Sequence, residues 1–173
     1  MNVGIIGSGG REHAITFSLS KSKKIGKIFC IPGNAGTENI AKNIQIDIND
    51  FKKIEEQVKK NKIELLIIGP EKPLVDGIVD FFHNTNIKVF GPNKAASQLE
   101  GSKIFTKEIC EKYNIPTAKF GIYKTFEDAN NFLKNASFPL VIKADGLASG
   151  KGVYIPESKE EGAQAVKEIF DGK

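Results

Sequence analysis

The fold is decided by residues 1–14, which read MNVGIIGSGGREHA. An apolar run at Val3–Ile6 precedes a group of glycines, and a helical pattern follows from Glu12 to Leu19. This order of strand, glycine-rich turn and helix predicts the opening unit of a parallel α/β sheet. The glycines let backbone N–H groups approach an anion, which the helix N-terminus also favours. A tight turn without a ligand would contain the same glycines, so this loop alone does not establish a site.

Farther along the chain, three more apolar runs predict parallel strands: Lys27–Ile31, Leu65–Ile68 and Lys88–Phe90. They are nearly continuous rather than alternating, as expected for strands covered on both faces. Helical patterns separate them, one starting at Phe51 with Asp50 as N-cap and one over Leu74–Phe82. We therefore predict an open, doubly wound parallel sheet of the Rossmann-like type over residues 1–101, with ligand-binding loops beyond the strand ends.

The pattern changes after residue 101, where residues 102–113 predict a helix capped by Ser102. A smaller α+β unit is predicted to follow, with these elements: helix Phe126–Leu133, strands Leu140–Lys143 and Gly152–Ile155, and helix Lys159–Phe170.

Composition excludes several classes of protein. Apolar residues make up 40% and charged residues 27% of the 173 residues, as in an ordinary globular chain. No apolar run is long enough for a membrane helix, and no basic segment precedes an apolar one at the N-terminus, so we expect a cytoplasmic protein without membrane contact. The net charge of +4 comes from lysines interspersed with glutamates, which disfavours a nucleic-acid surface.

Two further loops follow predicted strands, at residues 32–37 and 69–74. Asn34, Thr37 and Glu71 in these loops could hydrogen-bond a small polar substrate, and Arg11 is the only arginine in the chain. Each loop alone could be a plain turn, but three loops at one sheet edge indicate a site. The first loop lacks the dinucleotide fingerprint, because Glu12 stands where a small residue is needed and no acidic residue ends the second strand.

The fourth loop, residues 143–153, contains Gly146, Gly150, Lys151 and Gly152. Its spacing does not match a Walker A loop, and a strand rather than a helix follows it. We expect a flexible glycine-rich connection that folds over a triphosphate, with backbone amides, Lys143 and Lys151 as donors. A solvent-exposed turn without a ligand is the alternative.

Five motifs, in this order, resemble those of phosphoribosylamine–glycine ligase, also called glycinamide ribonucleotide synthetase: GGREHA at 9–14, PGNAGT at 32–37, GPExPL at 69–74, LEGSK at 99–103 and IKADGLAxGKGV at 142–153. Any one of them alone would indicate only the wider ATP-grasp superfamily, which includes biotin carboxylase. The resemblance implies a pre-ATP-grasp domain at 1–101, the start of the ATP-grasp core at 102–120 and most of the lid subdomain at 121–173.

The resemblance also implies a carbon–nitrogen ligase of de novo purine biosynthesis, which joins glycine to 5-phosphoribosylamine through glycyl phosphate and converts ATP to ADP and phosphate. ATP is then a substrate, Mg²⁺ (or Mn²⁺) the cofactor, and the full-length protein a monomer. The residues implied around the phosphosugar are Gly9, Gly10, Arg11, Asn34, Gly36, Thr37 and Glu71. Those implied around the ATP phosphates are Lys103, Lys143, Gly146, Ser149, Gly150, Lys151 and Gly152.

No residue is assigned as catalytic, because a single histidine such as His13 is more often a packed residue than a base. Family members are much longer than this chain, and we expect the adenine hinge, the acidic metal ligands and the glycine site in their C-terminal part. This chain alone is therefore expected to be inactive. Two alternatives stay open: a non-catalytic module that binds a phosphosugar or nucleotide, and another ATP-grasp ligase or carboxylase.

Overall fold

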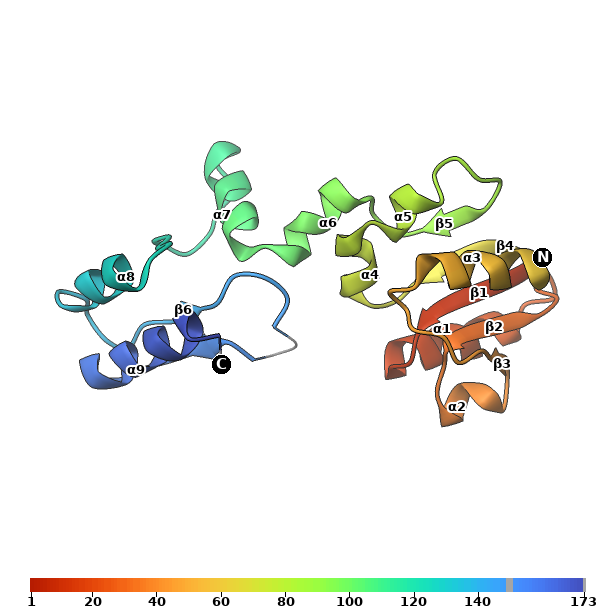
Figure 1. The fold of residues 1–173 in the computed structure, drawn as a ribbon, viewed down its shortest axis with the longest axis horizontal. Coiled ribbons are helices and arrows are strands. Elements are labelled where there is room, and N and C mark those ends of the chain that lie inside the picture. Colours follow the sequence, from red (N-terminus) through yellow and green to blue (C-terminus); the bar gives the residue numbers. More distant parts are fainter. Residues whose placement is uncertain (149–150, 173) are drawn as a thin grey trace. The chain divides into compact units, whose positions relative to one another are not determined.

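A computed structural model describes residues 1–148 and 151–172 of the chain (Figure 1). The chain divides into two compact units, Met1–Gly101 and Ser102–Lys173, and each unit has its own core.

Unit 1 is built on one five-stranded parallel sheet with the order β3-β2-β1-β4-β5. The strands are β1 Asn2–Gly7, β2 Ile28–Pro32, β3 Lys42–Asn43, β4 Ile63–Ile68 and β5 Lys88–Phe90. The predicted α/β sheet is thus confirmed, with one short strand, β3, that the sequence did not indicate. The register sets Gly7 opposite Pro32 and Ile6 opposite Ile68, so the loops after β1, β2 and β4 leave the sheet at the same edge.

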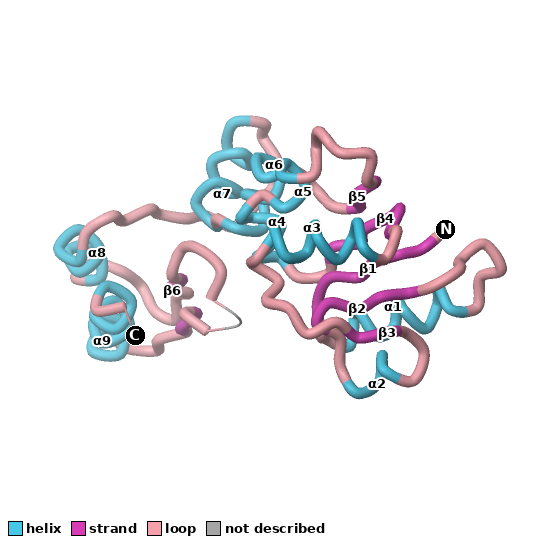
Figure 2. The backbone as a smooth tube through the Cα atoms, turned by 45° about the vertical axis from the view of Figure 1, so that its right-hand side comes forward, coloured by secondary structure: helices cyan, strands magenta, loops and turns pink. Residues whose placement is uncertain are grey.

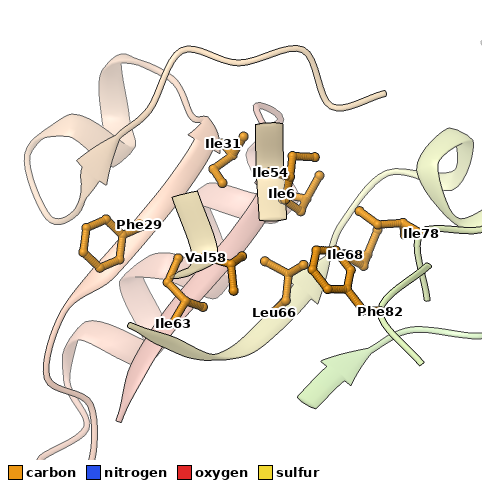
Figure 3. Close-up of a cluster of buried hydrophobic side chains, with 10 residues drawn as sticks. All are labelled: Ile6, Phe29, Ile31, Ile54, Val58, Ile63, Leu66, Ile68, Ile78 and Phe82. Atoms are coloured by element: carbon orange, nitrogen blue, oxygen red, sulfur yellow. The ribbon is translucent and has the colours of Figure 1, made fainter. Parts of the chain in front are cut away.

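Helices cover both faces of this sheet (Figure 2). α1, Gly10–Ser20, packs Ile15 and Leu19 against the face that carries Val3 and Ile5. On the other face, α3 (Phe51–Lys60) and α5 (Ile78–Phe81) enclose the larger core. Figure 3 shows this core, whose buried side chains are Ile6, Phe29, Ile31, Ile54, Val58, Ile63, Leu66, Ile68, Ile78 and Phe82. Its β1 and β4 members anchor the two strands from which the first and third loops emerge.

The helix predicted over Leu74–Phe82 is two helices, α4 (Glu71–Asp76) and α5. They part at Gly77, whose φ of +98° is a left-handed conformation that ends a helix and that side chains disfavour. Two other helices were not predicted, α2 (Ala35–Glu38) inside the second loop and α6 (Lys94–Gly101).

Unit 2 contains α7 (Lys103–Lys112), α8 (Phe126–Leu133) and α9 (Lys159–Phe170), together with the antiparallel strand pair of β6 (Ile142–Lys143) and β7 (Val153–Tyr154). α8 and α9 pack together around Ala129, Leu133 and Val166. Both strands are shorter than predicted. In the antiparallel register, Pro156 after β7 and Pro139 before β6 lie at the same end of the strand pair, and neither has an N–H with which to extend the pairing. Among the described residues, no helix is long and apolar enough to cross a membrane.

Candidate functional site

A shallow pocket of about 380 Å³ opens in unit 1 between the loops that follow β1 and β4. It is lined by residues 7–12, Ile48, Pro70 and Glu71. In the strand order 3-2-1-4-5 the chain reverses its direction of winding between β1 and β4, and open α/β sheets bind their ligands at this switch point. The pocket is therefore where the topology leads us to expect a ligand.

Arg11 connects the two loops that form the pocket. Its guanidinium donates one hydrogen bond to the Gly69 carbonyl and a second, of 3.2 Å, to Glu71 Oε1. The Arg11 side chain is 60% exposed, so the ion pair adds little stability but leaves donors on its open side. The first and third predicted loops thus meet through the only arginine of the chain.

Glu71 sits at the first position of α4 and stays ionised to lower pH than usual. Its pKa is lowered by the hydrogen bond from its own backbone N–H and by Arg11, although partial burial opposes the shift. At neutral pH the pocket rim therefore combines a guanidinium with a carboxylate, which can accept hydrogen bonds from hydroxyls or an amine.

Asn34 and Thr37 support the second loop from within. Asn34 Oδ1 accepts the Thr37 N–H at 3.0 Å and so caps α2, while Asn34 Nδ2 donates to the carbonyls of Ser8 at 2.9 Å and Gly9 at 3.3 Å. Thr37 is fully buried, and its hydroxyl contacts Asn34 and Asn43. Neither residue lines the pocket. Asn34 holds the first loop in place through Ser8 and Gly9, and Thr37 holds Asn34.

Gly36 is set against His13, because a Cβ at Gly36 would lie 2.7 Å from the imidazole Cε1. His13 thus packs α1 on α2 and does not line the pocket. This contact fits the expectation of a packed histidine better than that of a base.

The glycines around the pocket have two different surroundings. A Cβ at Gly7, Gly9 or Gly69 would collide with the side chain of Glu12, which is only 5% exposed. A Cβ at Gly10 would meet nothing within 4 Å. Of the two glycines of this loop that are predicted to contact the phosphosugar, Gly9 is packed against Glu12, and Gly10 has open space beside it.

In unit 2, Asp145 joins the start of α7 to the glycine-rich loop. Its carboxylate accepts hydrogen bonds from Ser102 Oγ at 3.0 Å and from the Ile104 N–H at 3.1 Å. Burial by itself would raise the pKa of Asp145, but the hydrogen bonds from Ile104, Ser102 and the neighbouring backbone outweigh it and lower the pKa. Lys103 Nζ donates to the Gly146 carbonyl at 2.8 Å, which adds a second link between the same segments.

The predicted phosphate-binding lysines of the loop are exposed. Lys143 lies on β6, paired with Val153, and Lys151 follows the part of the loop for which the structure gives no description. Gly146 and Gly152 adopt positive φ values of +91° and +70°, which glycine alone adopts readily. The predicted residues Ser149 and Gly150 lie outside the described residues.

The structural roles of Glu12 and Asp145 were not predicted from the sequence. An acidic residue three positions after the N-cap can cap a helix, and this signal was present at Glu12, three positions after Gly9. For Asp145 the signal was an acidic side chain in a loop that is predicted to bind phosphate groups.

Two domains of one known family match the chain, and their boundary lies next to the boundary between the two units. The phosphoribosylglycinamide synthetase N domain matches residues 1–100, and the ATP-grasp (A) domain of the same synthetase matches residues 101–173. The chain belongs to the phosphoribosylamine–glycine ligase family. The resemblance seen in the five motifs is thereby confirmed.

Relatives of this family match nearly the whole chain. The chain is 48% identical over 171 residues to phosphoribosylamine–glycine ligase of Caldanaerobacter subterraneus, which covers 99% of this chain and 40% of that protein. It is 44% identical to the ligase of Clostridium acetobutylicum, covering 42% of that protein. The chain therefore spans about 40% of the length of these relatives.

Solved structures agree with the fold. The phosphoribosylamine–glycine ligase of Thermotoga maritima matches with a TM-score of 0.72 at 37% identity, covering 99% of this chain and 38% of that one. The biotin carboxylase domain of 2-oxoglutarate carboxylase from Hydrogenobacter thermophilus matches with a TM-score of 0.75 at 19% identity, covering 98% of this chain and 40% of that one. At that identity the second likeness shows the fold alone.

Proposed function

We propose that unit 1 binds 5-phosphoribosylamine at the pocket beside β1 and β4, and that unit 2 contributes donors for the phosphates of ATP. The observation that carries this proposal is the pocket itself, where Gly9, Gly10, Arg11 and Glu71 come together in a chain of this ligase family. Gly10 leaves open space at a helix N-terminus, Arg11 offers guanidinium donors, and Glu71 offers an acceptor. Asn34, Gly36 and Thr37 then belong to the support of the site.

In the complete reaction, the γ-phosphoryl group of ATP moves to the glycine carboxylate, which gives glycyl phosphate and ADP. The amine of phosphoribosylamine then attacks the glycyl carbonyl, an amide bond forms, and inorganic phosphate leaves. The residues of this chain would bind and orient the phosphosugar and neutralise phosphate charge, which are the main contributions of a protein to phosphoryl transfer. Residues 102–120 would begin the ATP-grasp core and 121–173 most of its lid subdomain.

The ATP-grasp family uses Mg²⁺ with its ATP. Within residues 1–148 and 151–172, no three His, Cys, Asp or Glu side chains lie close enough together to hold a metal ion.

Isothermal titration calorimetry on the 173-residue chain tests the two binding roles separately. Ribose 5-phosphate, a stable analogue of the sugar, should bind. Arg11→Ala should lower the affinity for ribose 5-phosphate about tenfold or more, because a charge-assisted contact contributes ~1.5–3 kcal/mol. Lys72→Ala is the matched control, since Lys72 pairs with Asp76 outside the pocket. Lys143→Ala should lower the affinity for ATP by a similar factor, and Lys167→Ala on α9 is the control. If neither ligand binds at millimolar concentration, the proposal fails.

The complete reaction can be tested with a chimera that continues this chain with the matching C-terminal part of the Caldanaerobacter ligase. We expect phosphate release from ATP only when glycine and 5-phosphoribosylamine are both present. A requirement for bicarbonate instead of glycine would favour a carboxylase.

A further inference from the structure

Glu12 is a carboxylate buried at the edge where the pocket-forming loops leave the sheet. It is 5% exposed, and its Oε2 accepts the Gly9 N–H at 2.6 Å. Glutamate is rarely buried this far without a partner of opposite charge, and the ion pairs seen among the described residues do not include it. The position therefore calls for an explanation beyond packing.

Three glycines make the space that Glu12 occupies. A Cβ at Gly69 would lie 2.1 Å from Glu12 Oε1, one at Gly7 2.7 Å from its Cδ, and one at Gly9 2.9 Å from its Oε2. Gly7 is the last residue of β1 and Gly9 lies in the loop that follows it, whereas Gly69 belongs to the loop after β4. The side chain of Glu12 is thus a spacer wedged between the two loops.

The neighbouring residue, Arg11, also connects the same two loops. It donates to the carbonyl of Gly69, the residue at which an added Cβ would collide with Glu12. Two consecutive side chains of α1 therefore fix the position of Gly69, and with it the start of α4 at Glu71.

We propose that Glu12 is a positioning residue for the phosphosugar site. By its length and shape it sets the spacing between the loops after β1 and β4, and so the placement of Gly10, Arg11 and Glu71 around the pocket. This inference rests on the proposed function of the pocket and adds the residue that organises it.

A purely local role predicts something different. In a capping box, a glutamate or glutamine at the third helical position accepts the N–H of the N-cap residue, and aspartate is one methylene too short to do so. If Glu12 only caps α1, Glu12→Asp should disturb the Gly9 amide and the start of α1 but leave Gly69 and Glu71, on the other loop, unaffected. If Glu12 is a spacer, aspartate is one methylene too short, whereas glutamine keeps the length and can still accept the Gly9 N–H through its amide oxygen.

The test compares ribose 5-phosphate binding to the 173-residue chain and to the variants Glu12→Gln, Glu12→Asp and Glu12→Ala. We expect Glu12→Gln to bind within about threefold of the unchanged chain, and Glu12→Asp and Glu12→Ala to bind at least about tenfold more weakly, because displaced contacts lose most of their effect within ~1 Å. Glu56→Asp, an exposed substitution on α3, is the matched control and should change nothing.

Amide resonances supply a second measurement that does not depend on the ligand. In Glu12→Asp, the Gly69 and Glu71 cross-peaks should shift although they lie on another loop, and in Glu12→Gln they should stay near their original positions. The inference is overturned if Glu12→Asp leaves the Gly69 and Glu71 cross-peaks in place, whatever its effect on binding, or if glutamine fails as badly as aspartate. Should the unchanged chain not bind ribose 5-phosphate, the proposed function fails, and the cross-peaks still decide the role of Glu12.

Discussion

Replacing Gly69 by alanine tests the packing around Glu12 most directly. The new Cβ would lie 2.1 Å from Glu12 Oε1 and 2.6 Å from its Cγ, so the side chain must move by more than ~1 Å to reach the ordinary contact distance of about 3.5 Å. Gly69 does not have a positive φ, so backbone strain does not add to the effect. The collision with Glu12 is therefore the dominant cost of this substitution.

The expected loss of folding free energy in Gly69→Ala has two sources. Overpacking costs ~1–3 kcal/mol, and a lost hydrogen bond to a charged group costs ~1.5–3 kcal/mol. Because the two share one movement of Glu12, we expect about 2–4 kcal/mol in total rather than their full sum. For a domain the size of unit 1, this lowers the unfolding temperature by about 10 °C or more.

Thermal unfolding followed by circular dichroism measures this loss, and tyrosine fluorescence separates the units, because all three tyrosines lie in unit 2. The tyrosine signal should melt as in the unchanged chain. Gly10→Ala is the control, since its Cβ meets nothing within 4 Å, and it should be neutral or slightly stabilising.

A double substitution tests the cause. In a Glu12→Ala background, Gly69→Ala should cost less than about 0.5 kcal/mol, because the obstructing side chain is gone. Glu12 does not act as a spacer between the two loops if Gly69→Ala leaves the stability of the otherwise unchanged chain intact, or if the stability loss persists without Glu12.

Three further predictions concern the core of unit 1, the turn at Gly77 and the carboxylate of Asp145. Ile54→Ala removes a fully buried side chain and should destabilise unit 1 by ~2–5 kcal/mol in urea unfolding, whereas the exposed Lys52→Ala should stay within about 0.5 kcal/mol. Gly77→Ala forces a side chain into a φ of +98° and should cost ~1–2 kcal/mol, with Gly77→Asn costing less. Because the folded-state pKa of Asp145 is lowered, its stabilisation of unit 2 is present above its ordinary pKa near 3.8 and is lost as the pH falls through the folded value. Asp145→Asn should therefore flatten this acid dependence of the tyrosine-detected melt, and an unchanged pH profile would contradict the role of the carboxylate.

Much of the architecture could be predicted because it depends on local patterns. Apolar runs located the four longer strands of unit 1, and the helix caps Asp50 and Ser102 accept the backbone N–H groups expected of them. The helices Phe126–Leu133 and Lys159–Phe170 also begin and end where the periodicity indicated.

The parts that could not be predicted depend on tertiary contacts. α2 is only four residues long, too short to show a hydrophobic period, and it is held by Asn34, which also bonds Ser8 across the sheet edge. The division of α4 from α5 was visible in principle, because Gly77 is a typical helix terminator, but the apolar spacing continues through it.

The glycines of the first loop show why motif chemistry cannot be assigned from residue type alone. A glycine marks a place where something approaches the backbone closely, and that partner can be a ligand or a side chain of the same protein. At Gly7, Gly9 and Gly69 the partner is Glu12, whereas Gly10 faces open space. Replacing each glycine by alanine with and without Glu12 therefore separates the two causes: a cost that disappears with Glu12 is internal packing, and one that appears only in ligand affinity belongs to the site.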